Sequence, residues 1–465
     1  MKKINLGQSE VIHFVGIGGI GMSGLAQIMK NMGFNIQGSD QFKNKNTAAC
    51  IKAGIKVFNG HSKKNIKSST ILVRSSAIKN TNSEIKYAKK KKIPIYSRAD
   101  VLADVVSLKK NIIITGSHGK TTTTSLVAKI LSDQKLDPTI INGGVINSFK
   151  SNAKLGKGEW AILEADESDG SFLKLPINYS IVTNIDNEHL DYYKSFKNLE
   201  NSFMKFIEKT PPTGKAIVCI DSKNIKKIIS KIKNKNILTY GESKKADYRI
   251  SNVRYKVNFS IFDLNYKDIE KKNRKIKNIH LKLLGKHNVL NAVAALSVCL
   301  NLGVNQNIIK KSLKGFSGVQ RRMTKIFSKN QNDFYDDYAH HPTEISSILE
   351  SVRNVFKNKK IISVFEPHRY SRVLSLKKEF AKSFIKSDLV LLCPLYAAGE
   401  KRDTRYDQTN FGKLISKFSQ TQVILLKDLR EIRIYLKKNL FKDELIIGMG
   451  AGLISKSMRE LERTI

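Results

Sequence analysis

The sequence contains few cysteines and no long apolar run, and both shortages narrow the classes of protein to which it can belong. Its four cysteines, Cys50, Cys219, Cys299 and Cys393, stand far apart among apolar neighbours and form no C-x-x-C pair. We therefore expect buried thiols in a reducing compartment. No run reaches the roughly 18 apolar residues that a membrane span needs, and "INLGQSE" interrupts any signal sequence after the first lysines. We expect a cytoplasmic protein without membrane insertion.

Acidic residues are also scarce, with 40 Asp and Glu against 82 Lys and Arg, which leaves a formal charge of +42. Such an excess first suggests a nucleic-acid or anionic membrane partner. The excess is mostly lysine, however, and it is spread over helices and loops such as Lys86–Lys92 and Lys267–Lys277. This distribution favours solvated surfaces, and we predict no nucleic-acid partner. The alternative that the net positive charge creates an electrostatic field attracting small anionic substrates stays open.

The length of 465 residues exceeds what one hydrophobic core usually organises, and strand-like runs alternate with helical stretches along nearly the whole chain. We predict an α/β protein with three domains, spanning residues 1–108, 109–318 and 319–465. The first and third are predicted to be Rossmann-like. The central one is predicted to be a P-loop ATPase-type domain with a parallel sheet.

Apolar runs predict the strands of each domain. In the first domain they cover Val11–Gly16, Phe34–Asp40, Ser69–Ser76 and Ile93–Arg98, with a helix at Met22–Gly33. In the central domain they cover Asn111–Thr115, Glu159–Asp166 and Ser180–Asp186, followed by a buried helix at His287–Gly303. In the third they cover Asp333–Asp337, Ile361–Pro367, Leu389–Pro394, Val423–Leu426 and Glu444–Gly450. In the lysine-rich segment between Lys223 and Lys277, the apolar residues show no clear periodicity that would assign strands or helices.

A glycine-rich signature follows the first predicted strand. Gly16, Gly18 and Gly21 match G-x-G-x-x-G, and Asp40 ends the second strand about 20 residues later. This motif lets backbone amides approach a pyrophosphate at a helix N-terminus. NAD, another diphosphate such as a UDP-sugar, and tight packing alone all fit the pattern, and Asp40 could hold the nucleoside of either ligand.

A second phosphate signature, "GSHGKTT", begins the central domain at Gly116. The full P-loop pattern fails because Ile114 stands where its first glycine belongs. A β-branched strand nevertheless enters the loop and a helix leaves it, and Lys120 and Thr121 occupy the positions that contact β/γ-phosphates and Mg²⁺. An ordinary turn with an exposed lysine is the alternative, and His118 is equally well explained as a polar loop residue.

Charged and imidazole side chains follow later strands. Glu164 in "LEADESD" and His189 in "NIDNEHLD" should converge on the phosphate loop, because ligands gather at the carboxyl ends of parallel strands. They are candidate metal ligands, although solvation and helix capping explain them too. In the third domain, "DDYAHHPTE" and "FEPHRYSR" contain Arg369 and Arg372, which suit carboxylate or phosphate oxygens.

Eight motifs in this order resemble the Mur ligases: "HFVGIGGIGMSGLA", "TGSHGKTTT", "EADESDGSFL", "TNIDNEHLD", "GKHNVLNAVAA", "GVQRRM", "DDYAHHPTE" and "EPHRYSR". The resemblance implies that one glycine-rich loop holds the UDP of the acceptor and the other holds ATP. It implies that the carboxylate of UDP-N-acetylmuramate attacks ATP and that the amine of L-alanine displaces phosphate from the acyl phosphate. A family member that adds a tripeptide during peptidoglycan recycling is the alternative. The oligomeric state is not predicted.

The same resemblance assigns residues to each substrate and implies Mg²⁺ as a cofactor, with two ions. One ion would be held by Thr121 and Glu164, the other by His189. The UDP-substrate residues would be Gly16, Gly18, Gly19, Gly21, Ser39, Asp40, Ser75 and Ser76. The ATP residues would be Gly116, Ser117, His118, Gly119, Lys120, Thr121, Thr122, His287, Asn288, Asn291, Arg322 and Asp337. The alanine residues would be Tyr338, His340, His368, Arg369 and Arg372.

Six of these residues would carry the reaction: Lys120, Glu164, His189, Arg322, His340 and Arg372. Whether His340, another group or water accepts the proton of the alanine ammonium stays open. Two rival interpretations ignore the resemblance. A nicotinamide-dependent oxidoreductase would leave "GSHGKTT" without a role, and a nucleic-acid-stimulated ATPase would rest on the net charge alone.

Overall fold

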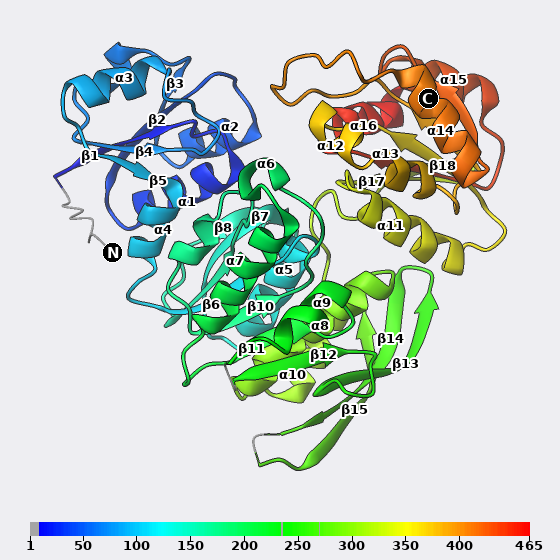
Figure 1. The fold of residues 1–465 in the computed structure, drawn as a ribbon, viewed down its shortest axis with the longest axis horizontal. Coiled ribbons are helices and arrows are strands. Elements are labelled where there is room, and N and C mark those ends of the chain that lie inside the picture. Colours follow the sequence, from blue (N-terminus) through cyan, green and yellow to red (C-terminus); the bar gives the residue numbers. More distant parts are fainter. Residues whose placement is uncertain (1–8, 234–235, 269) are drawn as a thin grey trace. The chain divides into compact units, whose positions relative to one another are not determined.

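The computed structural model describes residues 9–233, 236–268 and 270–465. The chain forms two compact units, shown in Figure 1. The first comprises residues up to Val253 together with Phe262–Leu281 and Leu290–Ser317, and the second comprises Arg254–Ile261, Lys282–Val289 and Gly318–Ile465. No helix within the described ranges is long and apolar enough to cross a membrane.

The first unit begins with a five-stranded parallel sheet in the order β3-β2-β1-β4-β5. Its strands are β1 (Val11–Val15), β2 (Asn35–Asp40), β3 (Lys56–Asn59), β4 (Ile71–Arg74) and β5 (Ile95–Ser97). Its helices are α1 (Ile20–Asn31), α2 (Lys45–Lys52), α3 (Ser83–Lys90) and α4 (Arg98–Val105). The four predicted strands and the first helix are confirmed. Strand β3 was missed because it is only four residues long, with exposed residues at both ends and two half-buried ones between them.

A ten-stranded sheet follows along the chain, in the order β15-β14-β13-β12-β11-β10-β6-β9-β7-β8. The strands are β6 (Lys110–Thr115), β7 (Thr139–Ile146), β8 (Ser151–Lys154), β9 (Trp160–Glu164), β10 (Tyr179–Val182), β11 (Ala216–Cys219), β12 (Ile237–Gly241), β13 (Tyr248–Lys256), β14 (Phe259–Lys267) and β15 (Asn273–Leu281). The β-branched residues Ile112, Ile113 and Ile114 are fully buried, as a central parallel strand requires. The order places β6 between β9 and β10, so the loops after these three strands meet at one edge.

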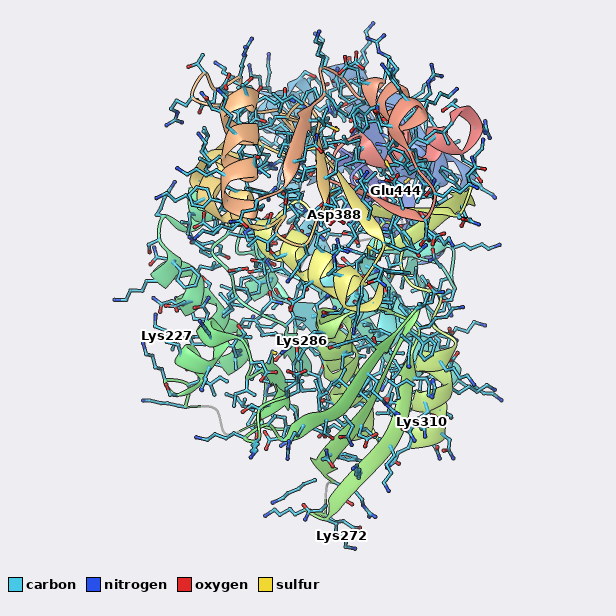
Figure 2. The ribbon with its side chains drawn as sticks, turned by 90° about the vertical axis from the view of Figure 1, so that its right-hand side faces the viewer. Lys227, Lys272, Lys286, Lys310, Asp388 and Glu444 are labelled. Carbon is cyan, nitrogen blue, oxygen red and sulfur yellow. The ribbon has the colours of Figure 1, made fainter. Side chains whose placement is uncertain are left out.

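Helices α5 (Lys120–Asp133), α6 (Leu190–Tyr193), α7 (Phe196–Glu208), α8 (Lys223–Ile229), α9 (Lys286–Asn301) and α10 (Gln306–Lys314) follow along the chain. The predicted buried helix corresponds to α9, where Ala292, Val293 and Leu296 have no exposed surface. The lysine-rich segment contains β12 to β15, and in β13 and β15 buried residues are interspersed with exposed charged ones. Lysines there point outward, as Figure 2 shows for Lys227 and Lys272, whose side chains are 58% and 65% exposed.

The second unit contains a six-stranded sheet in the order β16-β17-β21-β18-β19-β20. Its strands are β16 (Thr324–Lys329), β17 (Asn332–Asp337), β18 (Lys360–Phe365), β19 (Leu389–Leu392), β20 (Gln422–Leu425) and β21 (Glu444–Met449). The helices are α11 (Pro342–Val355), α12 (Tyr370–Ser375), α13 (Lys377–Lys382), α14 (Gln408–Ser419), α15 (Glu431–Asn439) and α16 (Ile454–Thr464). Five predicted strands are confirmed as parallel neighbours. Strand β16 was missed, because it is a half-exposed edge strand paired antiparallel to β17.

Apolar clusters cover both faces of this sheet, which explains why its strands read as continuous apolar runs. The four cysteines are buried and free, as predicted. Burial raises the pKa of the Cys50 thiol to about 12, so it stays protonated and unreactive at neutral pH.

Candidate active site

The loop between β6 and α5 has a backbone that only glycine tolerates at two positions. Gly116 and Gly119 have φ angles of +130° and +83°. A Cβ atom at Gly116 would lie 2.2 Å from Thr183 Oγ1, and one at Gly119 would lie 2.3 Å from Asn291 Oδ1. The tight curve leads directly into the N-terminus of α5, the arrangement that binds phosphate in P-loop proteins.

Lys120, the first residue of α5, lies back across this loop. Its Nζ donates to the carbonyl oxygens of Gly116 (2.6 Å) and Ser117 (3.2 Å), and it forms an ion pair with Glu167 at 2.9 Å. Burial alone would lower the pKa of Lys120, but the carboxylates of Glu167 and then Asp166 outweigh it and raise the pKa above its ordinary value. Lys120 is therefore a permanent cation beside the loop.

The loop is braced from β10 by the segment "TNID". The Thr183 hydroxyl donates to the carbonyl oxygen of His118 (2.6 Å), and the Asn184 side chain accepts from the amide of His118 (2.8 Å). The amide of Asp186 donates to Ser117 Oγ (2.8 Å), and its carboxylate lies 3.0 Å from His118 Nε2. His118 is thus an integral part of the loop. Sequence reasoning noticed the strand but missed these supports, although polar residues directly after a strand were the available signal.

Oxygen and imidazole ligands gather around the same edge of the sheet. The Thr121 hydroxyl donates to Glu164 Oε1 (3.1 Å), as two ligands of one cation would lie. His189 Nε2 is 3.5 Å from Glu167, and the potential ligand atoms of Glu167, Glu188 and His189 all lie within 4.8 Å of one another. Burial disfavours the charged imidazole, but hydrogen bonding to Glu167 raises the pKa of His189 overall. Glu167 and Glu188 were missed, because sequence spacing alone did not distinguish them from neighbouring loop acids.

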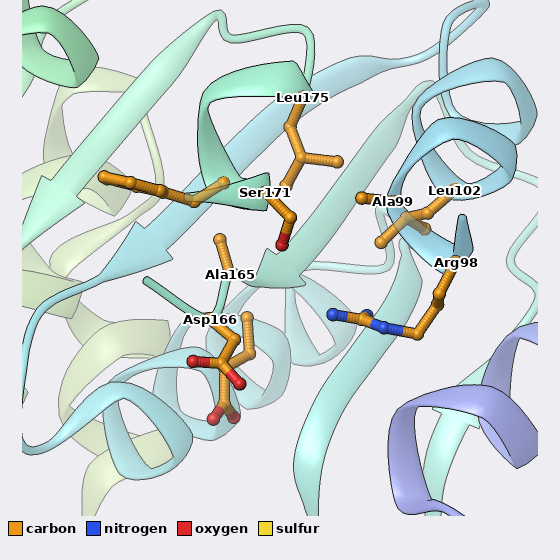
Figure 3. Close-up of a pocket in the computed structure, with 9 residues that line it drawn as sticks. Arg98, Ala99, Leu102, Ala165, Asp166, Ser171 and Leu175 are labelled. Carbon is orange, nitrogen blue, oxygen red and sulfur yellow. The ribbon is translucent and has the colours of Figure 1, made fainter. Parts of the chain in front are cut away.

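A small pocket adjoins Glu164 within the first unit (Figure 3). It is lined by Arg98, Ala99 and Leu102 from α4, by Glu164, Ala165 and Asp166 at the end of β9, and by Ser171, Phe172 and Leu175. The Arg98 side chain extends toward the side of the pocket where Asp166 lies in Figure 3. Its Nη1 would lie 3.3 Å from a Cβ at Gly21, so the small residue at the start of α1 leaves room for this cation.

The glycine-rich loop after β1 is tied to the end of β2. The amides of Gly16 and Ile17 donate to the carbonyl oxygen of Ser39 (2.8 and 3.0 Å), and the amide of Gly18 donates to Asp40 Oδ2 (2.7 Å). A Cβ at Gly18 would lie 2.8 Å from that oxygen. Four residues predicted for the UDP-substrate therefore meet here.

The other predicted UDP-substrate residues lie around this loop. Gly19 is the N-cap of α1, and Gly21 is in its first turn. Ser75, after β4, lies beside Gly16, since a Cβ at Gly16 would be 3.3 Å from that of Ser75. Ser76 is an exposed residue of the same loop.

In the second unit, side chains predicted for alanine binding form a cluster. The ring of His340 lies 5.1 Å from that of Tyr338 and 5.7 Å from that of His368. Arg372 Nη1 lies 3.2 Å from His368 Nδ1. Burial, together with the nearby His340 and arginines, lowers the pKa of His368 to about 3, so its imidazole is neutral and accepts from Arg372. Arg369 contributes its backbone amide to Tyr396 and has a positive φ.

Several residues predicted for ATP also belong to the second unit. Asp337 is 3% exposed and its carboxylate accepts from the amides of Met323 (2.6 Å) and Ala339 (2.7 Å). Burial raises its pKa to about 6. Burial lowers the pKa of His287 to about 4, and its Nδ1 lies 2.9 Å from Ser347 Oγ.

Two more of these predicted ATP residues have partners within the second unit. Asn288 donates to the carbonyl oxygen of Leu284 at 2.7 Å. The guanidinium of Arg322 lies over the Tyr338 ring, 5.4 Å from its centroid. In this conformation Asp337 and Asn288 stabilise local backbone, and their role toward ATP stays a prediction.

Profiles of three domain families match successive parts of the chain. Residues 11–110 match the Mur ligase family catalytic domain, 114–299 the Mur ligase middle domain, and 321–452 the Mur ligase glutamate ligase domain. A UDP-N-acetylmuramate–L-alanine ligase from Pelagibacter ubique is 54% identical over 463 residues, covering 100% of both chains. The chain belongs to the Mur ligase family. A second relative of the same name, from Rhodopseudomonas palustris, is 41% identical and covers 96% of this Mur ligase and 95% of its own length.

Solved structures agree with the fold of this Mur ligase. The UDP-N-acetylmuramate-alanine ligase of Thermotoga maritima superposes with a TM-score of 0.83 at 28% identity, over 97% of this chain and 98% of that one. A murein peptide ligase from Psychrobacter arcticus superposes with a TM-score of 0.72 at 21% identity, over 98% of both chains, and supports the fold alone. The predicted three-domain α/β fold is confirmed, whereas the predicted boundaries at 108 and 318 stay predictions.

Proposed function

We propose that this Mur ligase uses ATP to join L-alanine to the lactyl carboxylate of UDP-N-acetylmuramate, in the cytoplasmic synthesis of peptidoglycan precursors. The observation that carries the proposal is the relative with that printed activity, which matches the whole chain at 54% identity. The two glycine-rich loops support it, because the reaction needs one site for a UDP-linked acceptor and another for ATP. An NAD-dependent or nucleic-acid-dependent activity would leave one of these loops unused.

The chemistry explains why the loop residues are arranged as they are. A carboxylate cannot expel oxide, so phosphorylation must first convert one of its oxygens into a leaving group. Attack on the γ-phosphate then brings several anions together, and preorganised positive charge lowers that barrier. Lys120 supplies such a charge on the loop itself. ATP would replace Glu167 as its principal partner.

Two Mg²⁺ ions fit the side chains that the structure brings together. Thr121 and Glu164 would hold one ion, since their oxygens already lie 3.1 Å apart. His189 would hold the second with Glu167 and Glu188, which adds the oxygen ligands that this cation prefers. When bound, the ions neutralise charge on the transferring phosphoryl group. Glu167 is 1% exposed, and its Oε2 already faces a cation, the ammonium group of Lys120 at 2.9 Å.

The second unit would bind the amino acid. Arg372 is suited to pair with the alanine carboxylate, and neutral His368 holds its guanidinium in place. Tyr338 and His340 would close the site around a small side chain. His340 Nδ1 lies 3.4 Å from Glu344 and 2.9 Å from the Tyr338 carbonyl oxygen, which makes it a candidate to accept the ammonium proton.

A phosphate-release assay tests the whole proposal. Purified protein with ATP, Mg²⁺ and UDP-N-acetylmuramate should release phosphate rapidly only when L-alanine is added, and D-glutamate, diaminopimelate and the stem tripeptide should give little release. A Lys120→Ala protein is the matched control for contaminating phosphatases. Preference for the tripeptide would identify the recycling enzyme instead. Phosphate release that is independent of every amino acid and is stimulated by DNA or RNA would exclude this reaction.

A further inference from the structure

A fully buried carboxylate, Glu84 on α3, packs near the end of β2 and has no role in the reaction above. Its Oε2 accepts from Ser39 Oγ at 2.6 Å and lies 3.2 Å from His61 Nδ1. Its Oε1 accepts from the amide of Ser62 (3.1 Å) and from the side-chain amide of Asn65 (2.7 Å). Four donors surround the group, so a carboxylate fits this position and an amide, which brings a donor of its own, does not.

Two histidines complete the network. His13 Nδ1 lies 3.2 Å from Gln37 Nε2, and His13 Nε2 lies 3.3 Å from Ser39 Oγ and 3.5 Å from Glu84 Oε2. His61 directs its Nδ1 toward the same two oxygens. Burial would raise the pKa of Glu84, but hydrogen bonds from His13, His61 and Ser39 outweigh it and hold the pKa well below its ordinary value. Glu84 is therefore a buried anion stabilised by the groups that donate to it.

This network connects directly to the nucleotide loop. Ser39, which donates its hydroxyl to Glu84, uses its carbonyl oxygen to accept from the amides of Gly16 and Ile17. The next residue, Asp40, accepts from the amide of Gly18. His61, at the adjacent end of β3, has 13% of its side chain exposed and so extends the network to the surface at this edge. The position of one buried carboxylate thus governs the geometry of several groups predicted to meet the UDP-substrate.

We propose that Glu84 is a positioning residue for the UDP-linked acceptor, acting through Ser39 and His61 rather than by contact with the substrate. The inference rests on the proposed function, because it assumes that the first glycine-rich loop binds the acceptor. It assigns to Glu84 an effect on acceptor affinity that is separate from ATP binding and from the chemical step. Fixing Ser39 holds the curve of the glycine-rich loop through the amides of Gly16 and Ile17, and fixing His61 orients an imidazole near the end of the adjacent strand.

Glu84→Gln tests this proposal. Glutamine keeps the shape of the side chain, but its NH2 group is a donor and would face the donors that surround Glu84. We expect the KM for UDP-N-acetylmuramate to rise about 10-fold or more, as for the loss of charge-assisted hydrogen bonds, with the KM for ATP and kcat within about 2-fold. Glu200→Gln is the matched control. Glu200 is a 6% exposed carboxylate of the same unit, paired with Lys227 at 3.1 Å, and its replacement should leave both KM values unchanged.

Ser39→Ala and the double variant with Glu84→Gln show whether Glu84 acts through Ser39. If it does, Ser39→Ala alone raises the acceptor KM, and adding it to Glu84→Gln changes that KM by less than about 2-fold, because coupled residues are not additive. If Glu84→Gln does not fold, Ser39→Ala and His61→Asn carry the test with the same expected direction. Equal increases in the KM values for ATP and acceptor, or an unchanged acceptor KM in a folded variant, overturn the positioning role.

The parent protein separates the two levels of inference. If it releases phosphate with saturable dependence on UDP-N-acetylmuramate while Glu84→Gln behaves like the parent, only the role of Glu84 is wrong. If the parent shows no such dependence, the proposed function itself fails.

Discussion

Replacing Lys120 by methionine removes one partner of a buried ion pair and also the cation of the phosphate loop, so stability and activity should fall for different reasons. Glu167 is 1% exposed and the Lys120 side chain is 16% exposed. Breaking a buried pair by deleting one partner costs 3–5 kcal/mol, and partial exposure of the lysine places this case at about 3 kcal/mol. The melting temperature should fall by roughly 3–5 °C, because the unfolding entropy grows with the size of the unit that unfolds.

The double variant Lys120→Met with Glu167→Gln separates the two effects. It leaves Glu167 without its unpaired charge, so most of the lost stability should return, because burying a neutral amide costs less than burying an unpaired carboxylate. Turnover should stay at least ~100-fold below the parent in both variants, since the transferring phosphoryl group has lost a preorganised charge. Lys129→Met is the control, because Lys129 is on the same helix and pairs with Asp133 at the surface. It should change stability by less than about 0.5 kcal/mol.

Thermal unfolding followed by circular dichroism and a phosphate-release assay measure the two outcomes on the same preparations. A Lys120→Met protein as stable as the parent would show that the ion pair with Glu167 contributes nothing. A double variant that regains turnover would refute the catalytic role of Lys120.

Three further predictions concern other parts of the chain. Gly18→Val should abolish UDP-substrate binding in titration calorimetry but keep ATP binding, because its side chain would collide with Asp40 Oδ2, 2.8 Å from the Cβ position. Arg372→Ala or His368→Ala should raise the KM for alanine far more than that for ATP, since losing a charge-assisted pair to a carboxylate costs roughly 2–5 kcal/mol; equal effects on both would misplace the alanine site. Burial lowers the pKa of His287 to about 4 in the folded protein, against about 6.5 in the unfolded chain. As the pH falls from about 6.5 toward 4, the unfolded chain therefore takes up a proton that the folded protein does not, and the free energy of unfolding decreases. At pH 5 the free energy of unfolding should be about 2 kcal/mol lower than at neutral pH because of His287 alone. His287→Gln should remove this decrease when stability is measured by urea unfolding over that pH range.

The mechanism itself can be tested by isotope transfer. If the acceptor carboxylate attacks ATP, oxygen-18 in the lactyl carboxylate should appear in inorganic phosphate during turnover. Mass spectrometry of the released phosphate measures this transfer. Label that stays entirely in the amide product and water would exclude the acyl phosphate.

Local patterns made much of the fold predictable. Strands β1, β6 and β18 are short, mostly buried apolar runs, each followed by glycine or polar residues that end the strand, and such runs predict strands well. Strands β3 and β16 are half-exposed edge strands whose stability comes from their neighbours rather than from their own composition. The register of β13 to β15 escaped prediction for the same reason, because charged residues on the exposed face obscure the alternation.

The sequence by itself determined the two phosphate loops, because a positive φ at Gly119 and a lysine at the start of a helix are properties of a few consecutive residues. Only the tertiary structure decided which acids face that lysine. The order that places β6 between β9 and β10 brings Glu167 to Lys120 across 47 residues of sequence. It likewise packs Glu84 against Ser39 across 45 residues. Such pairings depend on which strand ends and helices become neighbours, and that choice is made by the burial of the whole sheet rather than by any local motif.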